Sequence, residues 1–235
     1  MNILVTGASK GIGRVIAQEL KTTGKIYVCA RNEAELKSLK PAGYMTCDLS
    51  HEYELSKLGD FIVENKIDVL VNNAGEYIYN EIEKTKINKL SHIMAVNLKA
   101  PIYLTARAVP YMKEKGFGRI INIGSISGVM GEANASLYSA TKAGLVGFAK
   151  ATGLELAEYG ITVNTINPGW VDTELGKKSI EESEFSEEEI LDCVPQKRYV
   201  DPKEIAGLVK YLISDSARGI TGQSINVCAG LSVGI

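Results

Sequence analysis

Short apolar runs rich in β-branched residues alternate along this chain with longer segments whose apolar positions recur at helical spacing. Apolar runs of this kind are typical of parallel strands that are buried on both faces. The predicted strands are Ile3–Thr6, Ile26–Ala30, Tyr44–Cys47, Val69–Asn72, Arg119–Ile123, Ile161–Ile166 and Ile225–Cys228. The predicted helices are Ile12–Thr22, Glu33–Leu39, Glu52–Asn65, Asn88–Lys115, Tyr138–Tyr159 and Pro202–Ser214. The alternation predicts an α/β fold, a doubly wound parallel sheet of about seven strands with helices on both faces.

The connection from Gly169 to Val200 is much longer than the others and is rich in glutamate. Long connections of this kind are uncommon inside a compact domain and often serve as lids or binding loops. Ser186 followed by Glu189 matches a capping box and predicts a short helix over Ser186–Cys193. Because no repeat or linker divides the chain, residues 1–235 are expected to form a single domain with a substrate lid at about 170–200.

Composition and charge narrow the class of protein. A net charge of −2 and a pI near 5.8 argue against nucleic-acid binding, and no apolar run is long enough to cross a membrane. The four cysteines and two histidines lack metal-ligand spacing, so no metal site is predicted. The first residues enter a strand at once, which leaves no room for a signal peptide and predicts a cytoplasmic protein.

A glycine-rich turn, Gly7-Ala8-Ser9-Lys10-Gly11-Ile12-Gly13, follows the first predicted strand and opens the first helix. Glycines at such a turn let the backbone approach a pyrophosphate, and the free N–H groups of the helix start bind its charge. The spacing is GxxxGxG rather than GxGxxG. The strand–turn–helix context predicts a Rossmann-like dinucleotide site, with a tight structural turn as the alternative.

The end of the second predicted strand bears on the choice between NADP and NAD. An arginine there accommodates the 2′-phosphate of NADP, whereas an acidic residue accepts from the ribose hydroxyl of NAD. Arg31 stands at this strand end, and Lys10 in the glycine turn offers a second cation. Glu33 and Glu35 are the competing candidates, but both lie in the next predicted helix, where a solvated face explains them. NADP is therefore the predicted cofactor and NAD the alternative.

A Tyr-x-x-x-Lys pair can place an ammonium beside a phenol, because residues four apart share a helix face. The spacing alone cannot choose among its occurrences. Only Tyr138 and Lys142 enclose small residues and open a helix rich in glycine and alanine. Ser125 follows the strand Arg119–Ile123, at the edge where open α/β sheets bind ligands. The four occurrences are Tyr53/Lys57, Tyr111/Lys115, Tyr138/Lys142 and Tyr199/Lys203.

Several short motifs occur in a characteristic order along the chain. They are Thr6-Gly7-x-x-x-Gly11-Ile12-Gly13, Asp48 after the third strand, Asn72-Asn73-Ala74-Gly75 after the fourth, Asn97, Ser125, Tyr138 with Lys142, and Pro168-Gly169 with Thr173. In this order the chain resembles, over its entire length, the short single-domain branch of the short-chain dehydrogenase/reductase family. The extended branch has GxxGxxG and a larger C-terminal domain, and this chain has neither.

The resemblance implies a role for each matching residue. Tyr138 would be the general acid, Lys142 would lower its pKa and bind the nicotinamide ribose, Ser125 would orient the substrate carbonyl, and Asn97 would hold a water. The implied NADP contacts, beside Tyr138 and Lys142, are Gly7, Ser9, Lys10, Gly11, Ile12, Gly13, Arg31, Asp48, Leu49, Asn73, Ala74, Gly75, Pro168, Gly169, Val171 and Thr173.

Within the family the chain is most similar to 3-oxoacyl-acyl-carrier-protein reductases, notably in the stretch 220–227. The resemblance therefore implies an NADPH-dependent reductase of a 3-oxoacyl thioester that acts in fatty acid biosynthesis and forms a homotetramer or homodimer through its long helices. The alternatives are an oxidoreductase of a free alcohol or ketone and a non-catalytic redox sensor. The intact Asn-Ser-Tyr-Lys set disfavours the sensor.

Charge near the predicted lid weakens the assignment of an acyl carrier protein as partner. Carrier proteins are acidic, so their docking face should be basic. Between Asp172 and Asp192 the chain has nine acidic residues against two lysines. Lys113, Lys115 and Arg119 are the candidates for a separate basic edge. The sequence therefore leaves a small-molecule ketone and an acyl thioester both open as substrates.

Overall fold

A seven-stranded parallel sheet forms the centre of the protein, in the order β3-β2-β1-β4-β5-β6-β7. The computed structural model describes residues 1–182 and 186–233. The strands are β1 (Asn2–Thr6), β2 (Lys25–Ala30), β3 (Gly43–Thr46), β4 (Val69–Asn72), β5 (Gly118–Ile123), β6 (Ile161–Pro168) and β7 (Ser224–Val227). All seven predicted strands are confirmed, with ends that differ by up to two residues; Cys47 and Cys228 lie just outside theirs. The predicted doubly wound α/β class is confirmed.

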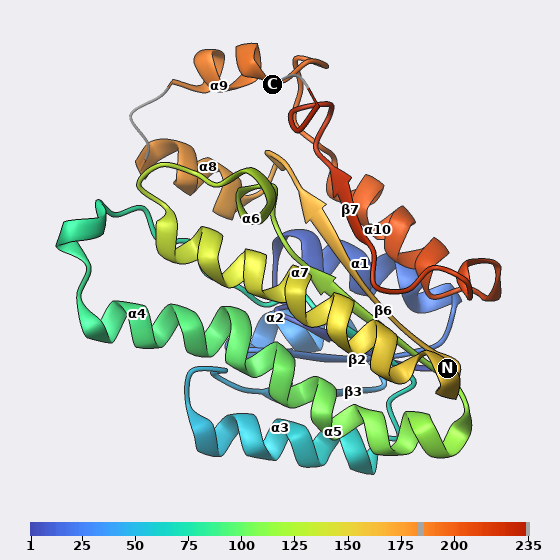
Figure 1. The fold of residues 1–235 in the computed structure, drawn as a ribbon. Helices are drawn as coiled ribbons and strands as arrows, with labels where there is room; N and C mark the ends of the chain where they lie inside the picture. Colours follow the sequence, from blue (N-terminus) through green and yellow to red (C-terminus); the bar gives the residue numbers. More distant parts are fainter. Residues whose placement is uncertain (183–185, 234–235) are drawn as a thin grey trace.

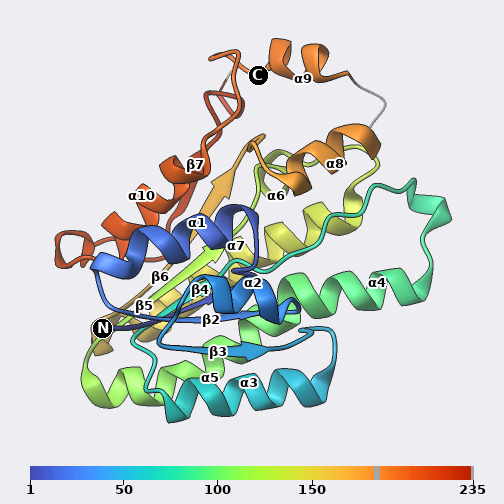
Figure 2. The same ribbon diagram turned by 180° about the vertical axis from the view of Figure 1, so that it is seen from behind.

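Helices cover both faces of the sheet (Figures 1 and 2). Ile3 and Val5 of β1 pack on one face with α1 (Gly11–Glu19), α2 (Glu33–Ser38) and α10 (Pro202–Leu212). Leu4, between them, packs on the other face with α3 (Glu52–Glu64), α5 (Ala100–Lys115) and α7 (Ser136–Leu156). Successive side chains of a strand point to opposite faces, so a wholly apolar strand serves two cores at once.

The long helix predicted over Asn88–Lys115 is not a uniform α-helix. It consists of α4 (Ile87–Met94), a π-helical stretch over Ala95–Lys99, and α5. A π-turn adds one residue to a helical turn and is often found at functional sites. Hydrophobic periodicity does not show this insertion, because the apolar stripe continues on either side of it.

The connection 169–200 contains two helices, α8 (Glu174–Glu182) and α9 (Glu187–Cys193), and Val171 pairs with Val200 where the connection begins and ends. Figure 1 shows both helices beyond the arrowhead of β6, above the carboxyl edge of the sheet. The predicted capping box is present: Ser186 Oγ accepts from the N–H of Glu189. The short helix α6 (Ser127–Met130), which follows β5, was not predicted.

Candidate active site

Hydrogen bonds hold the loops after β1 and β4 together. These two neighbouring strands form the topological switch point of the sheet, where the order of successive strands changes direction. Thr6 Oγ1 accepts hydrogen bonds of 3.0 Å from the N–H groups of both Asn73 and Ala74. Asn73 Nδ2 donates back to the carbonyl of Thr6 at 2.8 Å and to that of Gly7 at 3.3 Å. In open α/β sheets ligands bind at this switch point, outside the carboxyl ends of the strands. The predicted residues of both loops therefore lie at this switch point.

The glycine turn is packed too closely for side chains at two of its positions. A methyl group at Gly13 would lie 2.3 Å from Asn73 Nδ2 and 2.5 Å from the carbonyl oxygen of Gly7. Gly7 itself has φ +66°. The N-cap residue of α1 is Lys10, whose side chain pairs instead with Glu174 of α8 at 2.6 Å. The N-terminus of α1 therefore faces the carboxyl edge without a capping side chain from Lys10, an arrangement suited to an anion.

Arg31 follows β2 at the same edge, and its guanidinium lies among carboxylates. It pairs with Glu76 at 2.9 Å and lies 3.9 Å from Asp48. Burial acts to raise the pKa of Asp48, but hydrogen bonds from Ser50 and the charge of Arg31 hold it below its usual value. By contrast, the side chain of the neighbouring Leu49 is buried in the core, so only its backbone is available to a ligand.

The acidic alternatives at this strand end have other partners. Glu33 pairs with Lys37 at 3.0 Å and accepts from the phenol of Tyr44, and Glu35 pairs with Arg14. Both lie in the first turn of α2, where acidic residues complement the helix dipole. These contacts agree with their interpretation as a solvated helix face.

The Tyr138/Lys142 pair lies in the first turns of α7, against the end of β5. Lys142 is buried, and its Nζ donates to the carbonyl of Ile123 at 2.8 Å and lies 5.5 Å from the centroid of the Tyr138 ring. Burial lowers the pKa of Lys142 to about 8. Burial also raises the pKa of Tyr138 to about 12, against a lowering hydrogen bond with Ser125, so the lowering of this pKa by Lys142 that the resemblance implies is not found. The structure thus brings Ser125, Tyr138 and Lys142 together.

Asn97 occupies the middle of the π-helical stretch and faces the loop after β4. Its Nδ2 donates to the carbonyl of Glu76 at 2.8 Å, and its Oδ1 accepts from the N–H of Glu76 at 2.9 Å. A methyl group at Gly75 would lie 3.3 Å from Lys142 Nζ and 3.4 Å from Asn97 Oδ1. Asn97 therefore fixes the path of this loop beside the Lys142 ammonium.

The loops after β5 and β6 complete the edge. The N–H of Ile126, next to Ser125, donates to the carbonyl of Pro168 at 2.9 Å. The N–H of Gly169 donates to Val227 in β7. Thr173 lies beside the glycine turn, where a methyl group at Gly11 would be 3.6 Å from its Cγ2. The segments that carry the predicted residues thus meet along one edge of the sheet.

Three further polar residues lie around Tyr138, and sequence reasoning missed them. The Tyr77 ring packs edge-on against Tyr138 with centroids 5.1 Å apart, and its hydroxyl donates to Glu132 at 2.6 Å. Ser127 donates to the other Glu132 oxygen at 2.5 Å and accepts from Ser125 Oγ at 3.1 Å. A hollow of about 300 Å³ lies against Tyr77, Ile78, Tyr79 and Lys89. The only signal in the sequence was the position of Tyr77 two residues after Gly75.

The other Tyr-x-x-x-Lys pairs lie elsewhere. Tyr53 is 71% exposed, on the outer face of α3. Lys115 pairs with the buried Asp68 at the amino end of β4. Tyr199 precedes α10 and donates to Glu187 at 2.8 Å. Tyr138/Lys142 is thus the pair that lies beside Ser125 at the end of β5.

Comparison with known proteins identifies the family. A family model described as enoyl-(acyl carrier protein) reductase matches residues 7–232. A putative ketoacyl reductase of Streptomyces coelicolor is 41% identical, with 97% of this chain and 95% of the relative covered. The chain belongs to the short-chain dehydrogenase/reductase family. The predicted membership is thereby confirmed, and with it the prediction of an oxidoreductase.

Other members of the family extend the comparison. A 3-oxoacyl-(acyl-carrier-protein) reductase FabG of Rickettsia prowazekii is 37% identical, with 97% of this chain and 95% of the relative covered. A crystal structure of an actinorhodin polyketide ketoreductase variant with NADPH superposes with a TM-score of 0.92 at 38% identity, covering 99% of this chain and 97% of the other. The confirmed fold class thus agrees with that of a solved family member.

Among the helices of residues 1–182 and 186–233, none combines the length and the hydrophobicity that a membrane-spanning helix requires. The same part of the chain contains no group of three or more histidine, cysteine or acidic side chains able to hold a metal ion.

Proposed function

We propose that this protein is an NADPH-dependent reductase that converts the ketone of a 3-oxoacyl thioester to an alcohol. The observation that carries the proposal is the convergence of Ser125, Tyr138 and Lys142 at the carboxyl edge of a chain similar to ketoacyl reductases. The polyketide ketoreductase with NADPH supports the choice of cofactor.

The residues at the edge fit an NADP molecule. Gly7 and Gly13 keep the turn after β1 free of side chains, and the N-terminus of α1 offers N–H groups to a pyrophosphate. Arg31 supplies the cation for a 2′-phosphate. Lys142 has three N–H donors, of which one goes to Ile123, so it can also donate to a ribose hydroxyl. When bound, the cofactor supplies the hydride.

The chain's own residues supply the proton and position the ketone. With a pKa near 12, Tyr138 is protonated at neutral pH and can give its proton to the carbonyl oxygen. The Lys142 ammonium, 5.5 Å from the ring centroid, stabilises the phenolate that remains. Ser125 hydrogen-bonds Tyr138 and holds the carbonyl oxygen beside it. Tyr77 packs edge-on against the Tyr138 ring and helps to fix its position.

The basic edge expected for an acyl carrier protein is not present as predicted. Arg119 is 3% exposed and donates to the carbonyls of Gly118 and Gly160. Lys115 pairs with Asp68. Arg119 begins the strand that ends near Ser125, so it lies at the opposite edge of the sheet, about 20 Å away for six residues of strand. Arg119 and Lys115 therefore provide no basic surface beside the proposed active site.

The acidic residues of the connection 169–200 bear on the alternative substrate, a free ketone. In its described part Asp172 pairs with Lys177 and Asp192 with Lys197, whereas Glu188 has no such partner among the described residues. Glu184 lies outside the described residues, and the side chains of Lys178 and Glu182 are likewise not described. An acidic rim disfavours an acidic carrier protein but does not affect a small neutral ketone.

Substrate preference is tested by following NADPH oxidation with acetoacetyl thioesters, with acyl-carrier-protein-linked substrate and with a panel of free ketones. We expect the thioesters to have the highest kcat/KM. Good turnover of free ketones without thioester activity would contradict the thioester assignment. Equal kcat/KM with NADH would contradict the role given to Arg31.

The pH dependence of reduction provides a separate test of Lys142. Its ammonium deprotonates as the pH rises through about 8, whereas Tyr138 keeps its proton until about 12. We therefore expect kcat/KM for NADPH, which reports the titrating groups of the free enzyme, to fall about tenfold per pH unit above 8. A flat profile from pH 7 to 10 would exclude this role for the ammonium.

Segment 170–200 is proposed to be the substrate lid, and the protein to assemble through its long helices. The lid proposal rests on the position of α8 and α9 over the carboxyl edge and on the contact of Lys10 with Glu174.

The proposed assembly, a homotetramer or homodimer, is supported by exposed apolar side chains on α4, α5 and α7, namely Met94, Ile102 and Leu154. Light scattering of the purified protein measures its oligomeric state.

A further inference from the structure

Glu76 forms an ion pair with Arg31 that crosses the carboxyl edge of the sheet. Arg31 follows β2 and Glu76 follows β4, and β1 with its glycine turn lies between these strands. Neighbouring strands are about 4.8 Å apart, so the two loops are separated by roughly 10 Å, and a long side chain from each is needed to bridge them. The ion pair therefore crosses over the glycine turn, at the position where the dinucleotide is proposed to bind.

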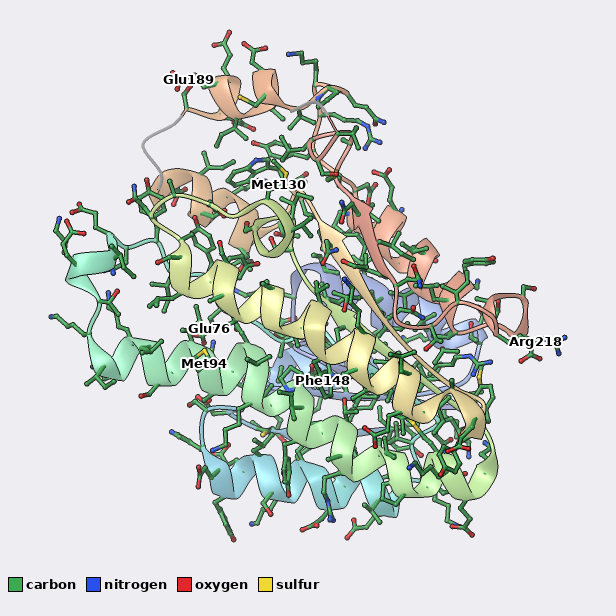
Figure 3. The ribbon with its side chains drawn as sticks, in the orientation of Figure 1. Glu76, Met94, Met130, Phe148, Glu189 and Arg218 are labelled. Atoms are coloured by element: carbon green, nitrogen blue, oxygen red, sulfur yellow. The ribbon has the colours of Figure 1, made fainter. Side chains whose placement is uncertain are left out.

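A second partner holds the Glu76 carboxylate from the other side. Glu76 Oε1 lies 2.9 Å from the Arg31 guanidinium, and Glu76 Oε2 is hydrogen-bonded to His92 Nε2 at 2.7 Å. His92 belongs to α4, and Figure 3 shows Glu76 close to that helix, near Met94. Glu76 can thus give up Arg31 without losing all of its partners.

We propose that Glu76 is a specificity residue that competes with the 2′-phosphate of NADPH for Arg31, with His92 receiving the carboxylate when the phosphate binds. The inference rests on the proposed function, in which Arg31 binds this phosphate. Two anions close to one guanidinium repel each other, and Asp48 at 3.9 Å adds a third negative charge. NADH has no 2′-phosphate, so its binding does not require Arg31 to change partner.

The substitution Glu76→Gln tests the competition without touching the Asn97 contacts, which involve only the backbone of residue 76. We expect the Kd for NADPH, measured by the fluorescence of the bound cofactor, to fall roughly two- to fivefold, because an exposed ion pair is a weak competitor. The Kd for NADH should stay unchanged. Glu81→Gln is the matched control, since it removes one charge from the exposed pair with Lys84 in the same connection.

His92→Leu provides the second arm. It removes the alternative partner of Glu76, so NADPH should bind more weakly in this variant, and the effect should vanish in the double variant with Glu76→Gln. An unchanged or higher Kd for NADPH in Glu76→Gln would overturn the proposal, and so would equal tightening of NADPH and NADH. Wild-type protein that binds neither cofactor would instead overturn the proposed function, whatever the variants do.

Discussion

Tyr138→Phe should lower kcat for ketone reduction at least about a thousandfold, because it removes the proton donor and leaves the ring in place. The pKa of about 12 keeps the Tyr138 phenol protonated at neutral pH. The buried ammonium of Lys142 lies beside its ring. Phe preserves the edge-on packing against Tyr77, so the fold and the surroundings of Lys142 should be retained. The Kd for NADPH should therefore stay nearly unchanged. Steady-state NADPH oxidation and fluorescence titration measure the two quantities.

Tyr53→Phe is the matched control for this prediction. Tyr53 has the same spacing to a lysine, and Lys57 Nζ lies 4.4 Å from its ring centroid, but the residue is exposed on α3. This variant should retain wild-type turnover. A Tyr138→Phe protein that keeps more than a tenth of wild-type kcat would contradict the assignment of Tyr138 as general acid.

Gly13→Ala should both destabilise the protein and weaken NADPH binding. The added methyl group would meet the Gly7 carbonyl at 2.5 Å and the Asn73 amide at 2.3 Å. Neither neighbour yields easily, because Asn73 Nδ2 is held by the carbonyl of Thr6 at 2.8 Å. Overpacking of this kind costs about 1–3 kcal/mol of the free energy of unfolding. The resulting shift of the glycine turn also moves the N-terminus of α1. Thermal unfolding and NADPH titration report the two effects.

Gly207→Ala is the same chemical change with the opposite expected sign. Gly207 lies in the middle of α10, outside the helices proposed to form the assembly, and nothing described comes within 4 Å of a methyl group there. Alanine is more stable than glycine inside a helix by about 0.5–1 kcal/mol, so this variant should unfold at a higher temperature. If both variants had lower melting temperatures by similar amounts, close packing at Gly13 would not be the cause.

Periodicity alone was sufficient to predict the strands and the layers. A run such as Ile3-Leu4-Val5 is apolar at every position because it faces two cores, and this property is local and visible in the chain. The proposed catalytic group was also visible, since Tyr138 and Lys142 are one helical turn apart and small residues lie between them. Parallel strands bring their carboxyl ends to one edge, so residues that follow different strands were expected to meet there.

Contacts between residues far apart in the sequence were decided only by the tertiary structure. The π-turn that carries Asn97 interrupts a helix whose apolar stripe continues, so no local pattern marks it. Arg119 reads as a surface cation, yet it is buried, and it donates to the carbonyls of Gly118, its neighbour in β5, and of Gly160, which precedes β6.

The sequence by itself determined the family and the sheet, because both depend on local patterns, and the small residues around Tyr138 and Lys142 singled out this pair for the proposed catalytic role. The partners of Arg31, by contrast, depend on two loops that are 45 residues apart and meet only because β1 lies between β2 and β4. The same is true of Glu132, whose carboxylate joins Tyr77 from the loop after β4 to Ser127 after β5. Side-chain contacts of this kind are set by strand order and packing, which no single segment of the chain encodes.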